Sequence, residues 1–152
     1  MTEYCPRLFE SDAAVRHIGE GLLACSLTRP EWTHEAHLAA CLWLVRERPD
    51  ICTENALPDI IRRFNEALGG VNDDHNGYHE TITQSFIIGV RLHLAERPGS
   101  EPLHASVNAL LASPLGRRDW PLRFYSRERL FSIAARRGYL TPDIKAFPRV
   151  PN

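Results

Sequence analysis

The chain has 152 residues, of which 43% are hydrophobic and 24% charged, and this balance excludes both a disordered and a fibrous protein. Its length is typical of one domain, so we predict a single helical domain over residues 1–152. The formal net charge of -1 argues against a nucleic-acid-binding protein, because such proteins usually carry a clear basic excess.

Apolar periodicity and helix-ending residues predict six helices along the chain. They are expected over about 12–26, 33–48, 58–68, 78–97, 100–112 and 126–138. Ser11 caps the first helix, Pro49 stops the second, and the pair Gly69-Gly70 ends the third. Residues 115–125 are expected to be irregular, and no segment has the alternating pattern of a strand. The predicted fold class is therefore all-α, a single compact bundle of about five or six helices with an extended C-terminal tail.

The tail after Tyr139 combines apolar residues with three prolines. Its apolar members are Leu140, Ile144, Phe147 and Val150. This pattern suits a segment that lies extended across the bundle, and it suits equally a segment that covers a neighbouring subunit. A homodimer is therefore one expected partner arrangement.

The cysteines and the N-terminal residues favour a cytoplasmic protein. The four cysteines are Cys5, Cys25, Cys41 and Cys52, and they form no C-x-x-C pair. A chain of this size needs no disulfides, so reduced thiols fit best. The N-terminus lacks a basic start followed by an apolar stretch, and no window approaches the roughly eighteen apolar residues of a membrane span. We expect neither export nor a membrane partner.

His34 and His37 are the first candidate functional residues. They lie about 60° apart on one face of the second predicted helix, which is apolar almost all round and so has the profile of a central helix. Two buried imidazoles one turn apart must both satisfy their ring nitrogens. A shared metal ion is one solution, and separate hydrogen bonds to carbonyls or carboxylates are another.

The position of His79 in the sequence favours a shared metal ion over separate hydrogen bonds. A helical projection places it on the same stripe as Ile82, Phe86 and Val90, so we expect it to be buried at the start of its helix. If the starts of the two helices are adjacent, three neutral imidazoles converge. Such a set leaves a divalent transition metal (zinc, iron, manganese or nickel) with an open coordination position, as in a reactive site. His34, His37 and His79 are the predicted metal ligands.

Acidic, phenolic and arginine side chains complete the predicted site. Glu80 follows His79 and is a candidate acid or base, although an acid in the first helical turn also suits the helix dipole. Tyr125 is a candidate catalytic hydroxyl, with a packed aromatic as the alternative. Seven arginines lie between Leu115 and Arg137, and Arg123, Arg127 and Arg129 are the candidates for binding an anionic substrate.

Three sequence blocks carry a resemblance. They are Glu31-Trp32-Thr33-His34-Glu35-Ala36-His37-Leu38, Gly77-Tyr78-His79-Glu80-Thr81-Ile82-Thr83 and Tyr125-Ser126-Arg127-Glu128-Arg129-Leu130-Phe131-Ser132. Together they resemble blocks that recur in this order in a group of small uncharacterised bacterial helical proteins. The resemblance spans about residues 29–143 and implies a shared fold, with no established activity. It implies that the three histidines form one set, together with Tyr125, Ser126 and Arg129.

Three functional hypotheses follow. The first is a metal-dependent enzyme, a hydrolase or an oxidoreductase, that acts on a small and anionic molecule. The second is a non-enzymatic helical module that binds a ligand or a partner and uses the histidines as hydrogen-bonded core residues. The third is metal-free acid-base chemistry by His79 and Glu80.

Overall fold

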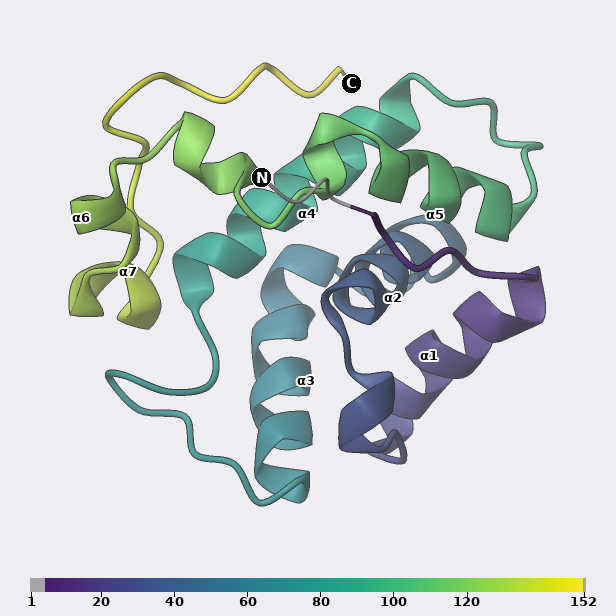
Figure 1. Cartoon of the computed structure of the whole chain (residues 1–152), viewed down its shortest axis with the longest axis horizontal. Coiled ribbons are helices and arrows are strands. Elements are labelled where there is room, and N and C mark those ends of the chain that lie inside the picture. Colours follow the sequence, from purple (N-terminus) through teal and green to yellow (C-terminus); the bar gives the residue numbers. More distant parts are fainter. Residues whose placement is uncertain (1–4, 152) are drawn as a thin grey trace.

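A computed structural model describes residues 5–151, and within this part of the chain the only regular secondary structure is helical, with no strand. The α-helices are α1 (Asp12–Ala24), α2 (His34–Glu47), α3 (Thr53–Ala67), α4 (Glu80–Ala95), α5 (Leu103–Ala112), α6 (Arg127–Leu130) and α7 (Ile133–Arg137). Three 3-10 turns connect them, η1 (Arg29–Glu31), η2 (Pro114–Gly116) and η3 (Trp120–Arg123). The predicted all-α bundle with a tail is confirmed (Figure 1).

Helix α2 is the centre of the bundle, as its apolar sequence predicts. It contacts α1, α3, α4 and α5, which surround it in Figure 1. Every residue from Leu38 to Leu44 is buried. Apolar burial at about 25 cal/mol per Å² makes these contacts the main source of the bundle's stability. The histidines at the start of α2 therefore belong to the central helix of the bundle.

Helix α1 packs closely on α2 because it carries a glycine at the contact. A Cβ atom at Gly19 would lie 2.2 Å from Cε3 of Trp43, well inside van der Waals contact. Glycine leaves room for the indole, at the cost of a lower helix propensity. The weakness that Gly19 introduces into α1 is thus offset by packing on α2.

Helix α3 begins at Thr53, several residues before the predicted start at Pro58. A proline inside a helix has no N–H for the carbonyl four residues earlier, which here belongs to Glu54. Gln84 of α4 donates its side-chain amide to that carbonyl at 3.0 Å. The interior proline is therefore tolerated because a neighbouring helix supplies the missing donor.

A second apolar cluster lies beside the main core, at the side of α4 that faces η3 and the tail. Its buried members are Trp120, Phe124, Tyr125 and Leu130. The Phe147 ring of the tail packs on Trp120 and Phe124, with centroid distances of 5.6 and 4.5 Å. The tail thus lies across its own bundle, along the edge that carries η3 and α6 in Figure 1.

The predicted helix over 126–138 is two short helices. Ser126 caps α6 through its bond from Arg129 N, and Ser132 caps α7 through a bond from Ala135 N. A serine hydroxyl competes with the helical backbone for hydrogen bonds and favours helix starts over helix interiors. Ser132 thus begins a new helix in the middle of the predicted one.

No helix within residues 5–151 combines the length and the apolar character that crossing a membrane requires.

Candidate functional site

His34 occupies the first position of α2, where the chain turns out of η1. Thr33 caps the helix by accepting the Ala36 N–H at 3.1 Å, so the position of His34 is set by the cap. The Nε2–H of His34 donates to the carbonyl of Gly116 at 2.8 Å. Since a carbonyl accepts only, the other nitrogen, Nδ1, is the unprotonated one. Burial lowers the pKa of His34 below its ordinary 6.5, which keeps the ring neutral near neutral pH.

His37 lies one turn further along α2 and is also tautomerically fixed. Its Nδ1–H donates to the Thr33 carbonyl at 2.7 Å, which leaves Nε2 as an acceptor. The ring packs on Trp32, with 3.8 Å between centroids and 32° between planes. Surrounding protein lowers the pKa of His37 to about 4, mainly through desolvation. The side chain is nevertheless exposed, because it borders two hollows at once.

The first of these hollows, which we call the histidine cavity, has a volume of about 370 Å³. Its walls come from α1, α2, α3, α4 and the segment before η3, and they consist of Leu22, Trp32, Thr33, His34, His37, Leu38, Cys41, Leu57, Ile61, Ile82, Thr83, Phe86 and Arg118. Most of these side chains are apolar, with a few polar groups among them. That composition is typical of small-molecule sites, and the volume is near the lower end of their range of about 300–1,000 Å³.

Arg118 is the single cation among the residues that line the histidine cavity. It is exposed, and no carboxylate among residues 5–151 forms an ion pair with it. Its charge contributes to the lowered pKa of both His34 and His37. The cavity therefore combines one cationic donor with two neutral imidazoles.

Cys41 contributes a thiol rather than a thiolate to the wall. Burial raises the pKa of Cys41 to about 12, so the sulfur stays protonated and weakly nucleophilic. A nucleophilic cysteine is not part of this cavity.

His79 does not join the other two histidines, and the prediction of a metal site is wrong. The residue precedes α4 with φ -131° and ψ 109°, so its backbone is extended and the helical projection does not apply to it. Its Nδ1 accepts the Ile82 N–H at 3.1 Å as an N-cap, and its Nε2–H donates to the Leu130 carbonyl at 2.8 Å. Both ring nitrogens are used by the protein.

Within residues 5–151, no three or more His, Cys, Asp or Glu side chains are grouped so that they could hold a metal ion. The loop before His79 supplies no such group either. Asp73 accepts backbone N–H groups of His75 and Asn76, and Asp74 pairs with Arg137. The hypothesis of a metal-dependent enzyme built on His34, His37 and His79 is therefore overturned.

Glu80 and Tyr125 lie outside the histidine cavity. Glu80 accepts a short hydrogen bond from the Tyr78 hydroxyl. Tyr125 is fully buried, donates its hydroxyl to the Leu140 carbonyl at 2.6 Å and has a raised pKa because of burial. These contacts match the packed aromatic that was the alternative for Tyr125, and the catalytic roles of both residues stay predictions.

The three predicted substrate arginines also lie elsewhere. Arg129 donates to the carbonyl of Thr141 at 2.7 Å and so holds the tail. Arg127 borders a separate surface hollow beside η3 and α6. Arg123 borders that same hollow and a larger groove, and none of the three lines the histidine cavity. Their substrate-binding role stays a prediction.

The sequence identified His34 and His37 but missed Arg118 and Trp32. Trp32 is two residues from His34, and its aromatic ring next to a histidine motif was a usable signal. Arg118 reaches the cavity because His34 is bonded to the neighbouring Gly116 across 82 positions of chain. No local pattern predicts that contact.

Comparison with known proteins adds no assignment: no protein-family model, no curated protein and no solved structure matches this chain. The function proposed below therefore depends on the geometry of the cavity alone.

Proposed function

We propose that the protein binds a small organic monoanion in the histidine cavity, with an apolar body among the aliphatic and aromatic walls and a carboxylate at Arg118. The observation that carries this proposal is the exposure of His37. An imidazole surrounded by protein is normally covered, yet this one is open to a hollow whose other walls are mainly apolar. Pockets that combine apolar walls with a few placed polar groups are the usual binding sites for small molecules.

The two imidazoles favour a ligand that carries a hydrogen-bond donor. Each uses its N–H on a backbone carbonyl, so His34 Nδ1 and His37 Nε2 are acceptors. A ligand hydroxyl matches such an acceptor, and a methylated hydroxyl does not. The preferred ligand class is therefore a hydroxylated aromatic or aliphatic carboxylate.

Isothermal titration with 3-hydroxybenzoate and 4-hydroxybenzoate tests the proposal. We expect a dissociation constant below about 1 mM for at least one isomer, and several-fold weaker binding of the matching methoxybenzoate and of the neutral hydroxybenzamide. Arg118→Gln is expected to weaken binding roughly tenfold. Arg117→Gln is the matched control, because the neighbouring Arg117 pairs with Asp119 and does not line the cavity.

Tryptophan fluorescence distinguishes binding in the cavity from general attraction of the anion to surface charges. Trp32 lines the cavity, so binding should change the tryptophan fluorescence of the natural protein and much less that of Trp32→Phe. Binding at this cavity would be contradicted by an equal loss of affinity in Arg117→Gln and Arg118→Gln. It would also be contradicted if none of the carboxylates gave a binding signal in the titration of folded protein.

The expected compartment belongs to the same proposal. All four cysteines are free in the structure, which supports a reducing environment such as the cytoplasm.

A further inference from the structure

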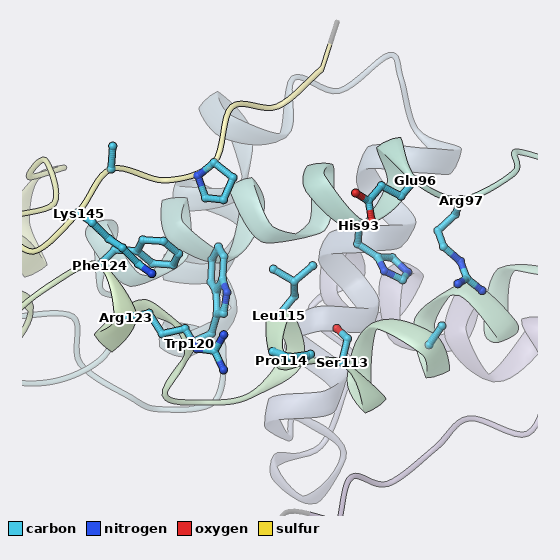
Figure 2. Close-up of a pocket in the computed structure, with 13 residues that line it drawn as sticks. His93, Glu96, Arg97, Ser113, Pro114, Leu115, Trp120, Arg123, Phe124 and Lys145 are labelled. Atoms are coloured by element: carbon cyan, nitrogen blue, oxygen red, sulfur yellow. The ribbon is translucent and has the colours of Figure 1, made fainter.

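A second hollow, which we call the tail groove, lies apart from the histidine cavity and shares no lining residue with it. It has a volume of about 690 Å³ and is bounded by the end of α4, the end of α5, η2, η3 and the tail. Figure 2 shows Arg123, Phe124 and Lys145 at one end of the groove, and His93, Glu96 and Arg97 at the other. Side chains from four separate stretches of chain thus face one space.

The charges in the tail groove are unevenly distributed. Arg97 is paired with Glu101. Arg123 and Lys145 are exposed, and neither forms an ion pair with a carboxylate of residues 5–151. The Lys145 ammonium lies 5.5 Å from the centroid of Phe124, which holds it near the ring without neutralising it. Two positive charges at one end of the groove therefore have no internal counterion.

The cationic end is built on a fixed support. The backbone N–H of Ile144 donates to the Phe124 carbonyl at 2.9 Å, which ties the residue before Lys145 to the bundle. Three residues further, the Phe147 ring packs on Phe124 and Trp120. Lys145 thus lies between two anchored positions of the tail. A ligand at this end would meet a largely preformed arrangement, which lowers the entropic cost of binding.

We propose that the tail groove binds a small organic phosphate, with the phosphate between Arg123 and Lys145 and the apolar part of the molecule against Leu115. A phosphate monoester carries nearly two negative charges near neutral pH, and two cations match it better than they match a carboxylate. The Arg123 guanidinium offers paired donors to phosphate oxygens, and the Lys145 ammonium adds a point charge. Glu96 at the opposite end disfavours a second anionic group there.

Phenyl phosphate is the probe, titrated into the 152-residue chain at about 50 and about 150 mM salt. We expect saturable binding with one site per chain, at least several-fold tighter than inorganic phosphate, and weaker at the higher salt concentration. Arg123→Gln and Lys145→Gln should each weaken binding roughly tenfold. Both residues are exposed, so the variants should fold normally, which circular dichroism and thermal melting would confirm.

Two controls distinguish a built site from general charge attraction. Arg63→Gln removes a charge from an exposed position of α3 that does not line the groove, and Arg149→Gln removes one from the same tail as Lys145. Both variants should bind phenyl phosphate as the natural protein does. Equal weakening in the controls and in the groove variants, or no saturable binding to folded protein, would overturn the proposal. Because Arg118→Gln should leave this binding unchanged, the outcome is independent of the histidine cavity.

Discussion

The histidine cavity and the tail groove differ in how the chain builds them. The cavity is enclosed mainly by four of the long helices, α1 to α4, and its polar groups are fixed by bonds to backbone carbonyls at Thr33 and Gly116. The groove is larger and its walls are 3-10 turns, helix ends and tail, held together by aromatic rings. The cavity is lined by a single cation and two neutral imidazoles, whereas one end of the groove carries two cations that no carboxylate of residues 5–151 pairs with. The same small bundle therefore offers two chemically different surfaces, one beside each of its apolar clusters, and Phe86 packs against both clusters.

Trp120→Ala is the strongest test of that separation. The indole is 2% exposed and lies at the centre of the second apolar cluster, so its loss should lower the free energy of unfolding by about 3–5 kcal/mol. Binding of phenyl phosphate should be lost, while hydroxybenzoate binding persists in the fraction that stays folded. Urea unfolding and both titrations measure this. Phe131→Ala is the control, because Phe131 is 56% exposed and its loss should change stability by under about 0.5 kcal/mol.

Gly19→Ala tests the other side of the molecule. The added methyl group meets Trp43 at 2.2 Å, and the resulting displacement should cost about 1–3 kcal/mol. The distortion falls on α1 and α2, so hydroxybenzoate binding should weaken and phenyl phosphate binding should not. Gly138→Ala is the matched control, since a Cβ there meets nothing within 4 Å and the residue has φ -152°. Unchanged stability in Gly19→Ala would show that α1 can shift freely.

Acidification acts on both regions through four histidines whose pKa values the folded protein lowers. The pKa values of His34, His37, His79 and His93 are all lowered, mainly by desolvation. The unfolded chain, with pKa values near 6.5, then binds more protons than the folded one. Their contribution to stability is therefore complete above about pH 6.5 and is lost as the pH falls toward the folded values. Urea unfolding at pH 7.5 and at pH 5.5 should differ by about 1–2 kcal/mol, with His37 contributing little because its ring is accessible.

His79→Asn tests the one of these histidines that joins the start of α4 to α6. Asparagine can cap α4 without titrating, so this variant should lose less stability than the natural protein between pH 7.5 and 5.5. It should also be somewhat less stable at pH 7.5, because the bond from His79 to the Leu130 carbonyl is gone. A pH profile identical to that of the natural protein would show that His79 does not contribute to the acid sensitivity.

Gln84→Ala is the mildest change. It removes the donor to the Glu54 carbonyl and should cost about 1 kcal/mol. Adding Pro58→Ala to this variant restores a backbone N–H for the same carbonyl, so the double variant should recover most of the loss. Urea unfolding of the natural protein, the two single variants and the double variant gives the coupling free energy between Gln84 and Pro58. Additive losses would contradict the role of Gln84 as the substitute donor for Pro58.

Helix periodicity predicted much of the fold, and its failures have specific causes. The extents of α1, α2 and α4 differ from prediction by only a few residues, because apolar spacing and end signals agree there. The start of α3 was misplaced because Pro58 looked like a first-turn residue, while its missing bond is supplied from α4. Such compensation depends on a neighbouring helix and has no local signature.

The candidate site shows the same limit. His34 and His37 share a helix, so spacing alone placed them together. The predicted position of His79 was wrong because the residue is the N-cap, one position before the first residue of α4. Its backbone is extended, so its ring points in a different direction from that of a helical residue. Arg118 joins the site through contacts over more than 80 positions of chain, which periodicity cannot detect.

The bond from His34 to Gly116 has a consequence for protein synthesis. As the chain leaves the ribosome, helices α1 to α5 emerge before the segment that carries Gly116 and Arg118. The central helices can begin to associate at that stage, yet the imidazole at the start of α2 still lacks its acceptor and the cavity still lacks its cation. If the cavity binds the proposed carboxylate, a nascent chain can do so only after residue 118 has been released, when all buried residues of the main core, 15 to 111, have already been synthesised.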